Sequence, residues 1–202
     1  MERNILYKTL TRNIIITQSN ILLSTSLITS QSAFFNNLCQ SGCRNYGQKY
    51  SCPPHSPKFT DFIRKAPPQA LVICYKMPLS YYSELSVYNR IRAGNSILKS
   101  LIDKELMQYR QKGYLVAGSG SCRACRTCGL KTDEPCRKPH KRIYSLEALG
   151  VDVDALVKDS FGFPLQWYFK GRPEPEYTCT VGAVFVPPGF SDFIETPQTT
   201  SA

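Results

Sequence analysis

The stretch that decides the fold is residues 114–136, YLVAGSGSCRACRTCGLKTDEPC. It begins with a short apolar segment, 114–117, that predicts a strand, and four small residues then lead into a loop. The loop carries four cysteines, the first three separated by two residues each: Cys122, Cys125, Cys128 and Cys136. Two intervening residues allow consecutive thiolates to point toward one centre, which is either a zinc ion or an iron–sulfur cluster. The first prediction is therefore a strand that ends in a metal-binding loop.

A second cysteine-rich stretch lies upstream, within residues 38–57. Its composition of Cys, Gly, Ser, Pro and Tyr is typical of a loop. It carries three cysteines: Cys39, Cys43 and Cys52. Three thiolates do not close a four-ligand shell, so either a fourth residue completes it or one metal position is open to substrate or solvent. The candidate fourth ligands are His55, Cys74 and Cys179, although free cysteines in predicted strands are usually small buried hydrophobes.

The two stretches together predict seven metal ligands: Cys39, Cys43, Cys52, Cys122, Cys125, Cys128 and Cys136. The run of three closely spaced cysteines matches that of a bacterial four-iron ferredoxin, so we expect an iron–sulfur cluster of the 4Fe-4S type. Zinc is the alternative, although zinc ligands usually come as two separated pairs. The sequence indicates no catalytic residue and no site for an organic cofactor, because it has no phosphate-binding loop, dinucleotide fingerprint or Ser/His/Asp arrangement.

The elements before the downstream loop predict the fold class. Residues 70–75 form an apolar run bounded by prolines, which indicates a buried strand. Apolar residues then recur at helical intervals from Ile91 to Tyr109, and Gly113 ends the pattern. Strand, helix and strand in this order resemble a βαβ unit. We therefore predict an α/β protein, with a small sheet, flanking helices and two cysteine-rich metal-binding loops at a strand end.

The remaining patterns complete the expected organisation. A strand is expected near residues 13–17, and Ser145 and Asp152 are expected to cap two short helices. Residues 163–169 and 177–186 predict a hairpin. The expected divisions are a variable N-terminal segment over 1–35, a cysteine-rich metal-binding domain over 36–186 and a loose tail over 187–202.

Length and composition limit where the protein is expected to be found and what it is expected to bind. Its 202 residues are enough for a core without disulfides, and nine cysteines cannot all pair with one another. No secretory signal is recognisable, and no stretch reaches the roughly 20 mostly apolar residues of a membrane span. We therefore expect a cytoplasmic protein that binds no membrane. The formal charge of +10 includes many cations around the downstream cysteines, where they offset thiolate charge, so we do not expect nucleic acid as a partner.

Several motifs together resemble a known family. They are Cys43-Arg-Asn-Tyr46-Gly47, Ser51-Cys52-Pro53-Pro54, the loop 122–136 followed by Arg137 and Pro139, and the stretch SLEALGVDV at 145–153. Over about residues 36–186 the chain resembles the uncharacterised cysteine-rich family described as predicted metal-binding proteins of bacteria and archaea. It departs from that family at Gln48 and Leu146, which are not ligand types. The resemblance implies metal binding through the seven loop cysteines, and it implies no particular reaction.

Three functions are consistent with these observations. The first is an iron–sulfur protein with a redox or accessory metabolic role, which would work with a redox partner protein. The second is an iron–sulfur enzyme that binds a small molecule at an open cluster position. The third is a zinc-stabilised module that contacts RNA or an acidic protein. The oligomeric state is not indicated.

Overall fold

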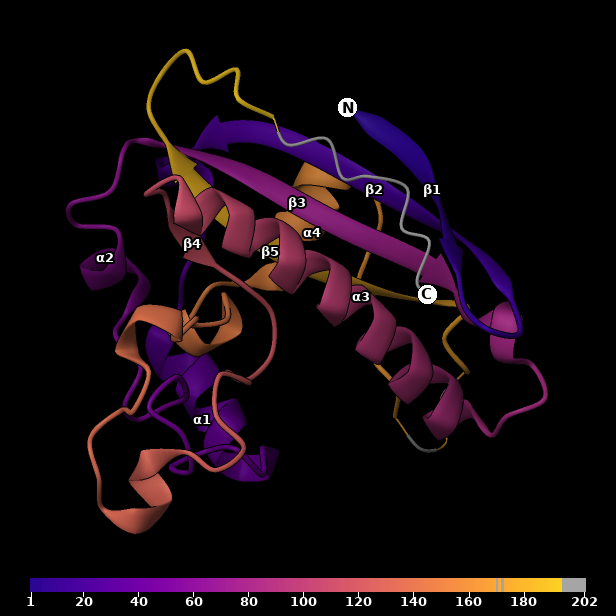
Figure 1. Ribbon diagram of the computed structural model, residues 1–202, viewed down its shortest axis with the longest axis horizontal. Helices are drawn as coiled ribbons and strands as arrows, with labels where there is room; N and C mark the ends of the chain where they lie inside the picture. The colour runs from indigo at the N-terminus through magenta and orange to yellow at the C-terminus, as the bar shows by residue number, and fades with distance from the viewer. Residues whose placement is uncertain (170, 172, 194–202) are drawn as a thin grey trace.

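A five-stranded antiparallel sheet forms the centre of the protein, as the computed structural model in Figure 1 shows. The structure describes residues 1–169, 171 and 173–193. The strands are β1 (Glu2–Lys8), β2 (Asn13–Ser24), β3 (Gln69–Pro78), β4 (Leu115–Ala117) and β5 (Tyr177–Val186). Their order is β1-β2-β3-β5-β4, and each neighbouring pair is antiparallel. The predicted α/β class is confirmed.

Helices cover both faces of this sheet. The described helices are α1 (Ser32–Gly42), α2 (Phe59–Phe62), α3 (Val87–Gln111) and α4 (Val153–Phe161), with 3-10 turns η1 (Thr25–Leu27), η2 (Leu79–Tyr82), η3 (Gly129–Thr132), η4 (Pro139–Lys141) and η5 (Glu147–Leu149). In Figure 1, α3 crosses the near face of the sheet and α4 lies behind it, while α1 lies beyond one end of the sheet. None of the helices that the structure describes has the length and apolar character needed to cross a bilayer.

The two faces of β3 explain why its sequence is continuously apolar. Leu71, Ile73 and Tyr75 belong to the core under α3, whereas Ala70 and Val72 belong to the core on the opposite face, under α4. Because side chains alternate along a strand, a strand covered on both faces has no polar side. From α3, five buried residues at intervals of one, three or four positions complete the first core: Leu98, Leu101, Ile102, Leu106 and Tyr109.

The predicted strand–helix–strand unit is present, with one strand inserted into it. Both β3 and β4 pair antiparallel with β5, so β3 and β4 are parallel to each other and β5 lies between them. Gly182 of β5 allows α3 and β4 to approach closely. A Cβ atom at this position would lie 2.9 Å from Leu106 Cδ1 and 3.1 Å from the carbonyl oxygen of Ala117.

The predicted hairpin of residues 163–169 and 177–186 is wrong in its first half. β5 covers 177–186, but residues 163–169 have no regular structure, and positions 170 and 172 of the expected turn lie outside the described residues. The segment is attached to β5 through side chains instead. Gln166 Oε1 accepts hydrogen bonds from the backbone amides of Glu176 and Tyr177, and the Tyr177 hydroxyl donates to the carbonyl of Pro164.

The ends of the chain pack onto the sheet. Residues 1–35 form β1, β2 and the first turn of α1, and β2 is longer than the strand predicted at 13–17. The upstream cysteine stretch is partly helical, since α1 extends to Gly42. At the other end, Phe190 is buried against Tyr109 and Tyr114, while 194–202 of the expected tail lie outside the described residues.

Candidate metal centre

The downstream cysteine loop is an excursion whose two ends are tied together. The backbone amide of Gly118 donates to the carbonyl of Tyr144 at 2.8 Å, and the amide of Leu146 donates to the carbonyl of Gly118 at 3.0 Å. Residues 119–143 therefore leave the edge of the sheet and return to the same place. In Figure 1 this segment extends away from the sheet, toward the end of the molecule where α1 lies.

Gly129 closes the loop upon itself. It is buried, and its carbonyl accepts a hydrogen bond of 2.9 Å from the amide of Glu134. A Cβ atom at this position would lie 2.4 Å from the carbonyl oxygen of Pro135, a distance that real Cβ atoms do not tolerate. Only glycine therefore permits this contact, which brings the segments that follow Cys128 and precede Cys136 together.

The four downstream cysteines line one cavity. Its volume is about 120 Å³, and its lining includes Cys122, Cys125, Cys128 and Cys136, which are all partly buried. Six cationic side chains line the same cavity: Lys49, Arg126, Lys131, Arg137, Lys138 and Arg142. Cations stabilise thiolates over thiols, so this surrounding favours the form of cysteine that binds metals.

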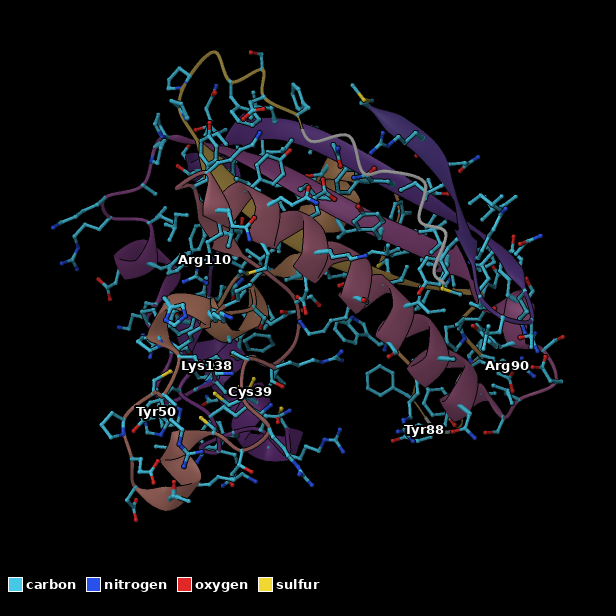
Figure 2. The ribbon with its side chains drawn as sticks, in the orientation of Figure 1. Cys39, Tyr50, Tyr88, Arg90, Arg110 and Lys138 are labelled. Carbon is cyan, nitrogen blue, oxygen red and sulfur yellow. The ribbon has the colours of Figure 1, made fainter. Side chains whose placement is uncertain are left out.

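The upstream stretch is bound directly to this loop. The ammonium group of Lys49 donates to Ser121 Oγ at 2.9 Å and to the carbonyl of Cys122 at 3.0 Å. Ser51 Oγ accepts a hydrogen bond of 3.2 Å from the backbone amide of Cys122. Figure 2 accordingly shows Cys39, Tyr50 and Lys138 gathered at one end of the molecule. Two segments whose contacting residues are 71 and 72 positions apart thus form one cysteine-rich region.

The upstream cysteines lie close enough for their charges to interact. Cys39 lies on α1, Cys43 caps the C-terminus of that helix, and Cys52 is buried in the following turn. Burial raises the pKa of the Cys39 thiol, and repulsion from Cys43 and Cys52 raises it further. Burial likewise raises the pKa of Cys52. The Ser51 hydroxyl and Lys49 lower that pKa, while Cys43 and Cys122 raise it.

The turn before α4 positions the upstream cysteine stretch. The amide of Gln31 donates to the carbonyl of Gly150 at 2.7 Å, and Ser56 Oγ donates to the carbonyl of Ala148 at 2.6 Å. Gly150 has φ of +86°, and a Cβ atom there would lie 2.5 Å from Ser32 Cα. The glycine therefore allows the start of α1 to pack against this turn, which sets where Cys39 lies.

The candidate fourth ligands lie in two different places. His55 is exposed, and its ring contacts that of Tyr50 with 5.9 Å between centroids. Cys74 is buried in β3, and a hydrogen bond with Cys179, followed by burial, raises its pKa well above the ordinary value. Neither Cys74 nor Cys179 lines the cavity of the downstream cysteines. The fold brings these two thiols to each other.

The donor set fits a thiophilic metal centre in its chemistry. Four cysteines around one cavity with a cationic lining match the ligands of zinc and of iron–sulfur clusters. Among the residues that the structure describes, no three His, Cys, Asp or Glu side chains are arranged as they stand to hold a metal ion. Ligation therefore requires the cysteine side chains to turn toward a common point.

The fold and the site define an α/β protein with a cysteine-lined, basic candidate metal centre at one end of its sheet. The chain belongs to the family described as predicted metal-binding protein (DUF2284), whose model matches residues 21–185. This match confirms the resemblance drawn from the motifs, and it includes both cysteine stretches. No curated protein and no solved structure matches the chain.

Some residues of the site were not anticipated from the sequence. The sequence pattern did not mark Lys49, and Ser51 was noted only as part of the motif around Cys52. Their hydrogen bonds to residues 121 and 122 join the two stretches. The signal available in the sequence was a cation and a hydroxyl group within three residues of the predicted ligand Cys52.

Proposed function

We propose that the seven loop cysteines bind an iron–sulfur cluster of the 4Fe-4S type, and that the protein has a redox or accessory metabolic role in the cytoplasm. The observation that carries the proposal is that Cys122, Cys125, Cys128 and Cys136 line a single cavity. Their spacing favours iron–sulfur over zinc, because the third cysteine follows the second so closely. When bound, such a cluster supplies one-electron transfer.

The side chains around the cavity support this assignment electrostatically. Four thiolates on a doubly positive zinc ion or cluster core carry a net charge of about −2. Lys131, Lys138 and Arg142 line the cavity and offset that charge. Arg137 is less available to offset the charge of the centre, because it forms an ion pair of 2.6 Å with Glu134. The exposed cations also suit an acidic redox partner protein, since charge complementarity favours association.

Metal analysis of anaerobically purified protein tests the proposal. We expect stoichiometric iron and acid-labile sulfide, together with visible absorption that dithionite bleaches. Cys125→Ser should remove this absorption, and Cys52→Ser shows whether the upstream cysteines share the centre or hold another. Cys179→Ser is the matched control, because Cys179 lies in β5 away from this cavity.

Two results would contradict the proposal. Colourless protein that contains zinc would replace the iron–sulfur assignment by the zinc alternative. Folded protein that contains neither iron nor zinc after oxygen-free purification would refute metal binding by these cysteines.

A further inference from the structure

A second cavity lies beside the cysteine loop. Its volume is about 340 Å³, which falls within the range of small-molecule sites. Its walls come from α3, from the start of the loop at residues 119–123, from the turn η5, from β5 and from residues 165–168. None of the seven predicted metal ligands lines it. The cavity is therefore a neighbour of the candidate metal centre and distinct from it.

Two buried polar atoms in this cavity have no hydrogen-bond partner among the described residues. They are Glu147 Oε2 and Thr180 Oγ1. Buried polar groups are nearly always hydrogen-bonded, because leaving one unpaired costs roughly 1–3 kcal/mol. An ionised carboxylate only accepts hydrogen bonds, so the missing group at Glu147 is a donor. The carboxylate oxygen thus calls for a ligand N–H or O–H group, whereas the Thr180 hydroxyl can either donate to a ligand or accept from it.

Glu147 is the ionisable group of the two. Its Oε2 atom is buried and lines the cavity without a partner among the described residues. A cationic donor beside this carboxyl group would form a charge-assisted hydrogen bond with it.

The cavity also contains positive charge. The ammonium group of Lys99 is paired with Asp103 at 2.8 Å, which leaves it further N–H donors. Arg123 is exposed and forms no ion pair with any described residue. A ligand that carries a carboxylate would pair with this guanidinium.

The remaining lining is apolar and aromatic. Ile91, Val153 and Val181 contribute aliphatic surface, and the exposed rings of Trp167 and Tyr168 lie at the same cavity. Trp167 is 58% exposed, which is unusual for the largest apolar side chain. A ligand with an apolar or aromatic body would cover these rings.

We propose that this cavity binds a small zwitterion of the amino-acid class. The ligand ammonium group donates to Glu147 and Thr180. Its carboxylate accepts from Arg123 and Lys99, and its apolar side chain packs against Trp167. Buried acid, exposed base and aromatic surface occur together in one cavity, and this combination matches the three parts of such a molecule. The proposal does not depend on which metal the cysteines hold.

Trp167 provides the assay, because it is the only tryptophan in the chain. Anaerobically purified protein is titrated separately with each common L-amino acid up to millimolar concentrations, and tryptophan emission is recorded. We expect a saturable change with amino acids that have an apolar or aromatic side chain. Phenethylamine lacks the carboxylate and 3-phenylpropionate lacks the ammonium group, and each should bind about tenfold more weakly than phenylalanine, since one charge-assisted hydrogen bond is worth at least that much.

Variants distinguish binding in this cavity from a non-specific change in tryptophan emission. Glu147→Gln should weaken binding about tenfold or more. Glu174→Gln is the matched control, because Glu174 is exposed, pairs with Arg90 and lies outside the cavity lining; it should change nothing. Thr180→Val provides a second test if Glu147→Gln fails to fold. Metal content is measured on the same samples, which separates loss of ligand binding from loss of metal.

Two outcomes would overturn the inference. One is that no amino acid changes the emission at millimolar concentrations. The other is that binding occurs with equal affinity in the wild-type protein and in Glu147→Gln.

Discussion

Replacing Glu105 by glutamine should make the stability of the protein less sensitive to pH. Glu105 lies on α3, has no solvent exposure and faces the sheet. Its carboxyl group accepts hydrogen bonds from Gln18 Nε2 at 3.0 and 3.2 Å and from the hydroxyl of Tyr75. Burial raises its pKa from 4.5 to about 7, although Tyr75, Arg3 and Gln18 lower it in part. Between pH 4.5 and about 7 the folded protein therefore holds a proton that the unfolded chain has already released.

The sign and the size of the effect follow from this difference in pKa. Between the two pKa values the folded state binds more protons, so stability falls as pH rises from 4.5 to about 7 and is level above that range. With about 1.4 kcal/mol for each pKa unit, the full loss is about 3 kcal/mol, and most of it falls between roughly pH 5 and 8. Glutamine is neutral at every pH and resembles the protonated acid, so it removes this contribution.

Urea unfolding of the wild-type protein and of Glu105→Gln, measured with a reductant at a series of pH values, checks the reasoning. The free energy of unfolding of the variant should rise relative to that of the wild type by about 2–3 kcal/mol from pH 5 to pH 8. Glu174→Gln, at an exposed site, is the control and should show a nearly constant difference. If the difference in free energy of unfolding between Glu105→Gln and the wild type is also constant across pH, the conclusion that Glu105 is protonated in the folded state is refuted.

Three glycine substitutions test how the site is positioned. Gly129→Ala should lower metal content while leaving the circular dichroism of the sheet unchanged, because the new Cβ atom meets the backbone of Pro135; full metal content would contradict the loop geometry. Gly150→Ala should cost about 1–3 kcal/mol in urea unfolding, through its positive φ and its contact with Ser32, and should reduce metal held by the upstream cysteines. Gly182→Ala should cost a similar 1–3 kcal/mol by overpacking β5 against α3.

Local patterns were sufficient for the elements whose period is clear. The helix predicted from Ile91 to Tyr109 lies within α3, and the apolar run 70–75 lies within β3. The N-cap predicted at Asp152 is present, since its side chain accepts from the amide of Ala155. Residues 163–169 are not the predicted strand, because alternation of apolar residues does not require a partner strand. Pro164 lacks an amide donor, and the chain there is held by Gln166.

The sequence by itself determined the α/β class, the family and the closeness of the four downstream cysteines, because these depend on residues that are near one another in the chain. Tertiary structure alone decided that Lys49 and Ser51 join the upstream stretch to that loop, and that Glu147, Arg123 and Trp167 share a second cavity. It also placed β5 between β3 and β4. Such contacts arise when distant segments pack together and satisfy buried hydrogen bonds, and no local period of apolar residues encodes which segments will meet.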